Sequence, residues 1–214
     1  MNTKDWNGNS RAVQAQKGIK ANYTTEDRES NDFYATDPIA IDVLFRHSIL
    51  KDMGILYHSD VIWECAAGAG NLSDRLTELG FIVYATDLID RGNCRVKPGV
   101  DFLQCTELPC DCNVILTNPP FKYATEFAQK ALELLPNGGY YIAFMNISYI
   151  TGQKRYNNIY KHGNLMAFCP FTKRVECWRN NDKEKYGGSA MVDFAWYIFK
   201  KGYKGLPNLV WLDR

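Results

Sequence analysis

Short apolar segments alternate along this chain with segments that have helical apolar periodicity, and this alternation limits the fold more than any other feature. The expected strands cover residues 61–65, 81–86, 113–117, 139–145, 165–169 and 192–199. The expected helices cover residues 38–50, 72–79, 123–135 and 152–161. Such alternation predicts an α/β fold, with a mostly parallel central sheet and helices on both faces. Because residues 170–189 look too loop-like for a crossover helix, we expect the last two strands to pair antiparallel.

Four residues, Asn118-Pro119-Pro120-Phe121, follow the expected strand at 113–117. Two consecutive prolines fix the backbone and cannot continue a strand ladder, so they predict a stiff loop at the carboxyl end of that strand. This loop would hold the Asn118 amide and nearby carbonyls beside the Phe121 ring. Binding a planar amine requires acceptors for two N–H donors and a ring face for stacking. The alternative is an ordinary loop ended by prolines.

A glycine-rich turn follows the expected strand at 61–65, which contains Glu64. Gly68 and Gly70 allow a tight turn and close approach of a ligand to the backbone, and the N–H groups of the following helix face the same crevice. The turn departs from the G-x-G-x-x-G dinucleotide fingerprint because Ser73 occupies the third glycine position. A turn that serves only packing is the alternative.

Two acidic residues follow apolar segments further along the chain. Asp87 ends the expected strand at 81–86, where doubly wound sheets hydrogen-bond a ribose diol. Asp101 precedes Phe102 and Leu103, and this triplet offers a polar partner and hydrophobic walls for an adenine ring. The structural alternatives are a helix-capping or turn aspartate at position 87 and a surface turn at position 101.

In this order, the motifs resemble S-adenosylmethionine-dependent methyltransferases of the nucleic-acid amino-methylating type, over residues 33–199. The resemblance implies a Rossmann-like fold and S-adenosyl-L-methionine as cofactor. Asn118, Pro119, Pro120 and Phe121 match the family's catalytic loop. The motif order and small size are similar to phage-type DNA adenine methyltransferases. The implied cofactor-binding residues are Phe33, Tyr34, Thr36, Glu64, Ala66, Gly68, Gly70, Asn71, Leu72, Asp87, Leu88, Asp101, Phe102 and Asn118.

Within that family, the Asn-Pro-Pro-Phe form implies methyl transfer to the exocyclic amine of adenine, and we expect the substrate to be DNA. We also expect low or short sequence specificity, because only 93 residues follow Phe121 and leave no room for a separate recognition domain. Three alternatives stay open: an RNA base methyltransferase, a protein glutamine methyltransferase, and an inactive cofactor-binding subunit. The basic carboxyl-terminal part argues against the second, and the intact catalytic loop against the third.

The net charge of +1 hides an asymmetry between two parts of the chain. Residues 1–150 carry 13 Lys and Arg against 19 Asp and Glu, whereas residues 151–214 carry 12 against 5, a net charge of +7. An excess of this kind indicates a polyanionic partner, and basic residues interleaved with aromatic ones are typical of nucleic-acid grooves. The candidate nucleic-acid contacts are Lys173, Arg174, Arg179, Lys183 and Lys185. A solvated basic face is the alternative.

Composition limits the remaining possibilities. The length of 214 residues suits one domain, expected at 31–214 after a flexible polar tail at 1–30. No run of about 18 apolar residues exists, so we expect no membrane span. The seven cysteines form no Cys-x-x-Cys pair, which predicts reduced thiols, a cytoplasmic location and no metal site. Oligomeric state, target sequence and substrate strandedness stay open.

Overall fold

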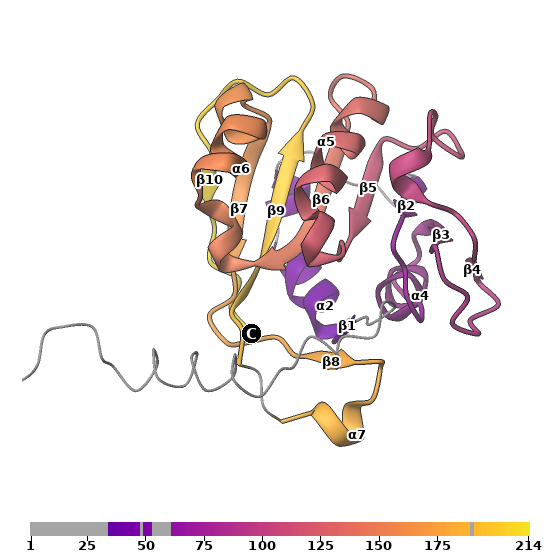
Figure 1. Ribbon diagram of the computed structural model, residues 1–214. Coiled ribbons are helices and arrows are strands. Elements are labelled where there is room, and N and C mark those ends of the chain that lie inside the picture. The colour runs from indigo at the N-terminus through magenta and orange to yellow at the C-terminus, as the bar shows by residue number, and fades with distance from the viewer. Residues whose placement is uncertain (1–33, 48, 53–60, 189–190) are drawn as a thin grey trace, which may run out of the picture. The chain divides into compact units, whose positions relative to one another are not determined.

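The computed structural model describes residues 34–47, 49–52, 61–188 and 191–214 (Figure 1). The expected tail at 1–30 and the candidate residue Phe33 lie outside the described residues. The division into a tail and a single domain at 31–214 stays a prediction.

The described residues form an eight-stranded sheet in the order β10-β7-β9-β6-β5-β2-β3-β4. Strand β9 pairs antiparallel with β6 and β7, and the other pairs are parallel. This confirms the mostly parallel sheet and the antiparallel pairing predicted for 165–169 and 192–199. The strands are β2 (Val61–Glu64), β3 (Ile82–Thr86), β4 (Val96–Lys97), β5 (Val114–Thr117), β6 (Tyr140–Asn146), β7 (Leu165–Pro170), β9 (Phe194–Lys200) and β10 (Asn208–Leu209).

Helices cover both faces of this sheet, as the sequence predicts; Figure 1 shows α5 and α6 in front of it and α2 behind it. The α-helices are α2 (Ile39–Arg46), α3 (Ile49–Asp52), α4 (Asn71–Glu78), α5 (Ala124–Leu134), α6 (Gln153–Asn158) and α7 (Lys183–Tyr186). The 3₁₀ turns are η2 (Phe102–Gln104), η3 (Phe121–Tyr123), η4 (Ile147–Ile150) and η5 (Tyr160–His162).

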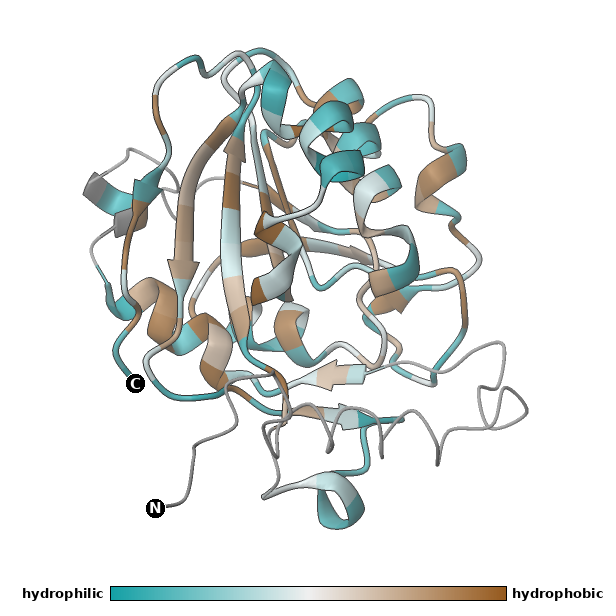
Figure 2. Cartoon of the chain, turned by 60° about the vertical axis from the view of Figure 1, so that its left-hand side comes forward, coloured by the Kyte–Doolittle hydropathy of each residue, from teal (hydrophilic) through white to brown (hydrophobic). Residues whose placement is uncertain are grey.

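The hydrophobic core lies in two layers because side chains alternate across the sheet. Ile62 packs with residues of α2 and α4 on one face, while its neighbour Trp63 packs with residues of α5 on the other. Figure 2 shows hydrophobic residues along the central strands and hydrophilic residues on the outward turns of the helices. Strands buried on both faces explain why the sequence reads as continuous apolar runs.

Several features of the fold differ from the sequence prediction, which did not include the short strands β4 and β10. The helix expected at 38–50 is divided into α2 and α3, because His47 adopts an extended backbone. The helix expected at 152–161 stops at Asn158 and continues as the turn η5. A separate two-stranded antiparallel sheet joins β1 (Tyr34–Thr36) to β8 (Cys177–Arg179), and the sequence analysis predicted neither strand.

Candidate functional site

The strand order reverses between β2 and β5, because the chain proceeds from β2 to β3 and β4 on one side and from β5 to β6 on the other. In open α/β sheets, ligands bind at the carboxyl ends of the strands at such a switch point. Glu64 ends β2, Asp87 follows β3 and Asn118 follows β5. The fold therefore brings three of the sequence-predicted site residues to one edge of the sheet.

The glycine-rich turn is fixed to strand β3 by backbone and side-chain hydrogen bonds. The N–H of Ala67 donates to the Thr86 carbonyl at 2.9 Å, and the N–H of Gly68 donates to Asp87 Oδ2 at 2.7 Å. Gly70 precedes α4 with a φ of 92°, and a Cβ there would lie 2.1 Å from Asn93 Nδ2. The turn thus needs glycine at position 70 for both its backbone conformation and the space beside it.

Asp87 holds the turn and faces the switch point. Its side chain is buried, and Oδ1 accepts the N–H of Ile89 at 2.9 Å while Oδ2 accepts that of Gly68. A carboxylate oxygen has two lone pairs, so each oxygen retains the capacity to accept one more donor, such as a ribose hydroxyl. The neighbouring Leu88 is exposed.

Glu64 is a buried carboxyl group with an unpartnered oxygen. Its side chain is only 1% exposed, and Oε2 has no hydrogen-bond partner among the residues that the structure describes. Burial raises the pKa of Glu64 from 4.5 to about 8. A cationic group placed beside Oε2 would favour the ionised carboxylate and satisfy the orphaned atom.

The Asn118 side-chain amide is held from one side only. Its Nδ2 donates to Thr36 Oγ1 at 2.8 Å and to the backbone carbonyl of Tyr34 at 3.3 Å. The Tyr34 carbonyl can only accept, so the amide nitrogen must face it and the oxygen must face away. That oxygen, Oδ1, is buried and has no partner in the described part of the chain. The amide is thus preoriented, and the described residues leave its oxygen unused as an acceptor.

The rest of the proline loop lies next to a small cavity. Pro119 is buried, Pro120 is exposed, and the Phe121 ring is 47% exposed. This ring lies 5.8 Å from the ring of Phe194, measured between centroids. The adjacent cavity has a volume of about 220 Å³ and is lined by Phe121, Ala124, Met145, Asn146, Ser148, Tyr149 and Arg155. Its residues after β6 were not among the sequence-predicted site residues.

Residues 101 and 102 have different environments. Asp101 is exposed and its Oδ1 accepts the N–H of Leu103 at 3.0 Å, which caps η2. The Phe102 ring is 2% exposed and packs between Trp63 and Phe127, at centroid distances of 5.2 and 4.8 Å. The Phe102 ring therefore lies in the core between the sheet and α5, and only Asp101 offers an accessible side chain.

Three other candidate residues belong to the glycine-rich turn and the start of α4. Ala66 is half-buried and Leu72 is buried. Asn71 Nδ2 donates to Asn181 Oδ1 at 3.0 Å, so the amino end of α4 contacts the segment between β8 and α7. Sequence reasoning had no signal for this contact, because the two residues are 110 positions apart.

The five predicted nucleic-acid contacts lie in β8, in α7 and in the segment just before β8. Lys173 is exposed, and Arg174 pairs with Asp193 at 2.7 Å. Lys183 lies over the Trp178 ring and Lys185 over the Tyr186 ring. The fifth residue, Arg179, is opposite Tyr34 in the β1–β8 sheet. This sheet joins the basic segment to the strand that holds the Asn118 amide.

The described residues also bear on metal binding, on the state of the thiols and on membrane spans. Across the described ranges, no group of three or more His, Cys, Asp or Glu side chains could hold a metal ion. All seven cysteines are free. Of the helices that the structure describes, none is long and apolar enough to cross a membrane.

Comparison with protein families and with curated proteins gives no match. Among solved structures, the chain is similar to a protein of Listeria monocytogenes assigned to the class I S-adenosylmethionine-dependent methyltransferases. The identity is 14% over 94% of this chain and 70% of that chain, with a TM-score of 0.55. It is also similar to a modification subunit assigned to a type I restriction enzyme of Vibrio vulnificus, at 13% identity over 92% of this chain and 49% of that one, with a TM-score of 0.54.

A third similar structure is the type IIG restriction endonuclease BpuSI, at 17% identity over 85% of this chain and 27% of that chain, with a TM-score of 0.55. At these identities the similarity concerns the fold. The sheet described above, with its reversed strand order and antiparallel β9, is the Rossmann-like fold of class I S-adenosylmethionine-dependent methyltransferases.

Proposed function

We propose that this chain is an S-adenosyl-L-methionine-dependent methyltransferase that methylates the exocyclic amine of adenine in DNA. The observation that carries the proposal is the Asn118 amide, whose nitrogen is bound to Tyr34 and Thr36 and whose buried oxygen is unused. An acceptor fixed in this way, at the carboxyl edge of a methyltransferase fold, suits the N–H group of a planar amine.

The residues at the switch point fit the proposed cofactor. The unpartnered Glu64 oxygen suits a cationic group, the turn at Gly68 and Gly70 leaves its backbone close to a ligand, and Asp87 has spare lone pairs for ribose hydroxyls. Asp101 extends this row of acceptors toward an adenine ring. We assign these five positions, together with Tyr34 and Thr36 of β1, to cofactor binding.

The chain's own contribution to the chemistry is orientation of the amine. That amine is a poor nucleophile because its lone pair is delocalised into the purine. Asn118 Oδ1 and the Pro119 carbonyl would accept hydrogen bonds from its two N–H groups. These hydrogen bonds favour a tetrahedral nitrogen with a localised lone pair. S-adenosyl-L-methionine supplies the electrophilic methyl group. Positioning and electrostatic stabilisation, without a covalent enzyme intermediate, account for such a transfer.

The target base would occupy the cavity of about 220 Å³ beside the proline loop, where Phe121 offers an exposed ring for stacking. In a duplex, the base must first leave the helix, at a cost of a few kcal/mol that is smaller in a single strand. Lys173, Arg174, Arg179, Lys183 and Lys185 would contact the phosphates. DNA is favoured over RNA because two structures similar to this fold belong to restriction enzymes, which act on DNA.

The test is to incubate the purified full-length chain and labelled cofactor separately with duplex DNA, single-stranded DNA, RNA and a protein pool, then to digest each sample and identify the product. We expect methyl-labelled N6-methyladenine from DNA. Label in an RNA base or in glutamine would contradict the proposed substrate but would still support methyltransferase activity. Absence of label in every pool, with cofactor bound normally, would contradict the activity.

A further inference from the structure

The positive charge of residues 151–214 is concentrated away from the predicted contacts around β8. Residues 170–193 carry five Lys and Arg against four Asp and Glu, a net charge of +1. Two other segments, 147–169 and 194–212, carry no Asp or Glu at all. Their basic residues are Lys154, Arg155, Lys161, Lys200, Lys201 and Lys204.

None of these six cations forms an ion pair with a carboxylate among the residues that the structure describes. Arg155 Nε donates to the Thr151 carbonyl and Lys204 Nζ to the His162 carbonyl, whereas Lys154 and Lys161 are exposed. Backbone carbonyls do not cancel a positive charge. The surface formed by α6, η5 and the connection from β9 to β10 therefore carries an excess of positive charge that favours binding of an anionic partner.

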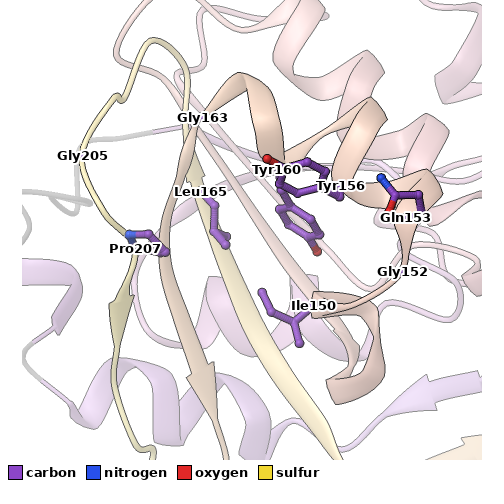
Figure 3. A pocket seen from close by; sticks show the side chains of 9 residues that line it. All are labelled: Ile150, Gly152, Gln153, Tyr156, Tyr160, Gly163, Leu165, Gly205 and Pro207. Atoms are coloured by element: carbon purple, nitrogen blue, oxygen red, sulfur yellow. The ribbon is translucent and has the colours of Figure 1, made fainter.

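The same segments line an open cavity of about 470 Å³, within the range of about 300–1,000 Å³ typical of ligand sites. Its lining residues, shown in Figure 3, are Ile150, Gly152, Gln153, Tyr156, Tyr160, Gly163, Leu165, Gly205 and Pro207. Tyr160 is fixed, since its hydroxyl donates to the Tyr149 carbonyl at 2.9 Å and its ring stacks on Phe199. Tyr156 is 54% exposed, so its ring is accessible.

Residues of η4 and α6 line both this cavity and the cavity beside Phe121. Tyr149, which receives the Tyr160 hydrogen bond, lines the smaller cavity together with Arg155 of α6. Gln153 and Tyr156, also of α6, line the larger one. The two cavities thus share η4 and α6 as a common wall, and a bound strand could follow this wall from one cavity to the other.

We propose that the larger cavity is a second nucleobase site, which takes an unpaired base of the strand that carries the target base. Aromatic rings bind any base through its π-face, and the Gln153 amide can pair with a base edge. Lys154 and Lys161 are exposed and follow the lining residues Gln153 and Tyr160 in sequence, and they bind the adjacent phosphates. This inference rests on the proposed function, because it assumes a nucleic-acid substrate.

The test measures binding of a labelled single-stranded oligonucleotide, and of an abasic oligonucleotide of equal length, to the full-length chain by fluorescence anisotropy. The wild type should bind the base-carrying strand more tightly. Tyr156→Ala should lose that preference, with affinity for the base-carrying strand reduced about fivefold to 100-fold, and should bind the abasic strand as the wild type does.

Charge reversal tests the phosphate contacts. Lys154→Glu with Lys161→Glu should weaken binding of both strands and lower the log–log salt slope by about 1.4, since each single-strand phosphate contact contributes about 0.7. The matched control is Lys51→Glu with Lys97→Glu. It reverses two exposed lysines, one on α3 and one on the edge strand β4, which lies at the other end of the sheet from β10. This control should bind as the wild type does.

Three results would overturn the inference. In the first, the Tyr156→Ala variant and the Lys154→Glu/Lys161→Glu variant bind as the wild type does, while a Lys173→Glu/Lys185→Glu variant binds more weakly. This result would refute the second site and leave the proposed function intact. Displacement of the oligonucleotide by a polyglutamate peptide at lower concentration would assign the surface to an acidic protein. No oligonucleotide binding by a wild type that still binds the cofactor would refute the nucleic-acid substrate as well.

Discussion

The side chain that most restricts the chemistry is Asn118, because its nitrogen is used by the protein and its oxygen is not. Asn118→Ala should lower kcat for methyl transfer by about 10²–10³-fold, as expected for loss of one preorganised hydrogen-bonding group. Cofactor affinity should change little, because the acceptor acts mainly in the transition state. Single-turnover kinetics with calorimetry of cofactor binding measures both. Near-normal turnover would show that the loop is only structural.

Thr36 should act on the reaction by positioning Asn118. Its hydroxyl accepts the amide hydrogen at 2.8 Å. Thr36→Val keeps the shape and removes this acceptor, which should lower kcat about threefold to tenfold, in line with a hydrogen bond of about 0.5–1.5 kcal/mol. Thr36→Ser should restore most of the rate, because the serine hydroxyl can accept the same hydrogen bond. Equal kcat values for the valine and serine variants would contradict this role.

Glu64 should make stability depend on pH. The folded state binds its proton more tightly than the unfolded state, since the pKa is about 8 instead of 4.5. The free energy of unfolding should therefore fall as pH rises from about 4.5 to 8 and then level off, by on the order of a few kcal/mol. Glu64→Gln should abolish this fall. Urea titrations across that range measure it, and equal pH profiles for both proteins would contradict it.

These residue-scale features show where sequence reasoning stops. The prolines after β5 predicted a fixed asparagine, because their effect on the backbone is local. The orientation of the amide depends on Thr36, 82 positions away, and the pKa of Glu64 depends on burial by neighbouring strands. Neither property can be obtained from spacing or residue type.

At the scale of elements, apolar runs predicted six strands of the central sheet, with ends that agree within one or two residues at β2, β3, β5, β6, β7 and β9. Strands β1, β4, β8 and β10 were not predicted, because they have only two or three residues, too few to show an alternation. They form because the surrounding chain brings them to a partner. The β1–β8 sheet, which holds Asn118, was thus the part of the site least accessible to prediction.

The glycine-rich turn offers a test that separates backbone conformation from steric space. Gly70→Ala adds a Cβ to a residue whose φ is 92°, and this Cβ would lie 2.1 Å from Asn93 Nδ2. The control Gly92→Ala has a positive φ of 81° and no atom within 4 Å of the new Cβ. We expect a cost of about 1–2 kcal/mol for the control and a larger cost, with weaker cofactor binding, for Gly70→Ala.

Urea titrations give the two free energies of unfolding, and calorimetry gives the two cofactor affinities. Because a Cβ at position 92 has no close neighbour, the cofactor affinity of Gly92→Ala should match that of the wild type. Equal losses of stability in the two variants would mean that the Asn93 side chain moves aside without cost. The turn would then require glycine at position 70 for its φ alone.

At the scale of the whole molecule, charge and fold divide the surface into distinct regions. The carboxyl edge of the sheet gathers the carboxylates Glu64, Asp87 and Asp101, whereas the unpaired cations lie around α6 and beyond β9. A cationic cofactor and an anionic strand would therefore approach the proline loop from different sides. The sequence contains the charge excess and the segments without acidic residues, but not their place in the fold, because Arg155 of α6 reaches the cavity beside Phe121 only through the packing of distant segments.

The ion pair between Arg174 and Asp193 leads to a quantitative expectation for the predicted contacts around β8. On duplex DNA, each phosphate contact adds about 0.9 to the log–log salt slope. Lys173→Glu with Arg174→Glu should lower that slope by about 0.9 and not by twice as much, because Asp193 already neutralises much of the Arg174 charge. Cofactor affinity should stay the same, since exposed charges separated by more than about 10 Å are screened.

The measurement is a salt titration of duplex binding for the wild type, the double variant and Lys173→Glu alone. The double and single variants should have nearly equal slopes if Arg174 is held by Asp193 when DNA is bound. A slope lowered by about 1.8 in the double variant would show that Arg174 exchanges its carboxylate partner for a phosphate. An unchanged slope in both variants would remove residues 173 and 174 from the DNA interface and leave the cations around α6 as the main candidates for it.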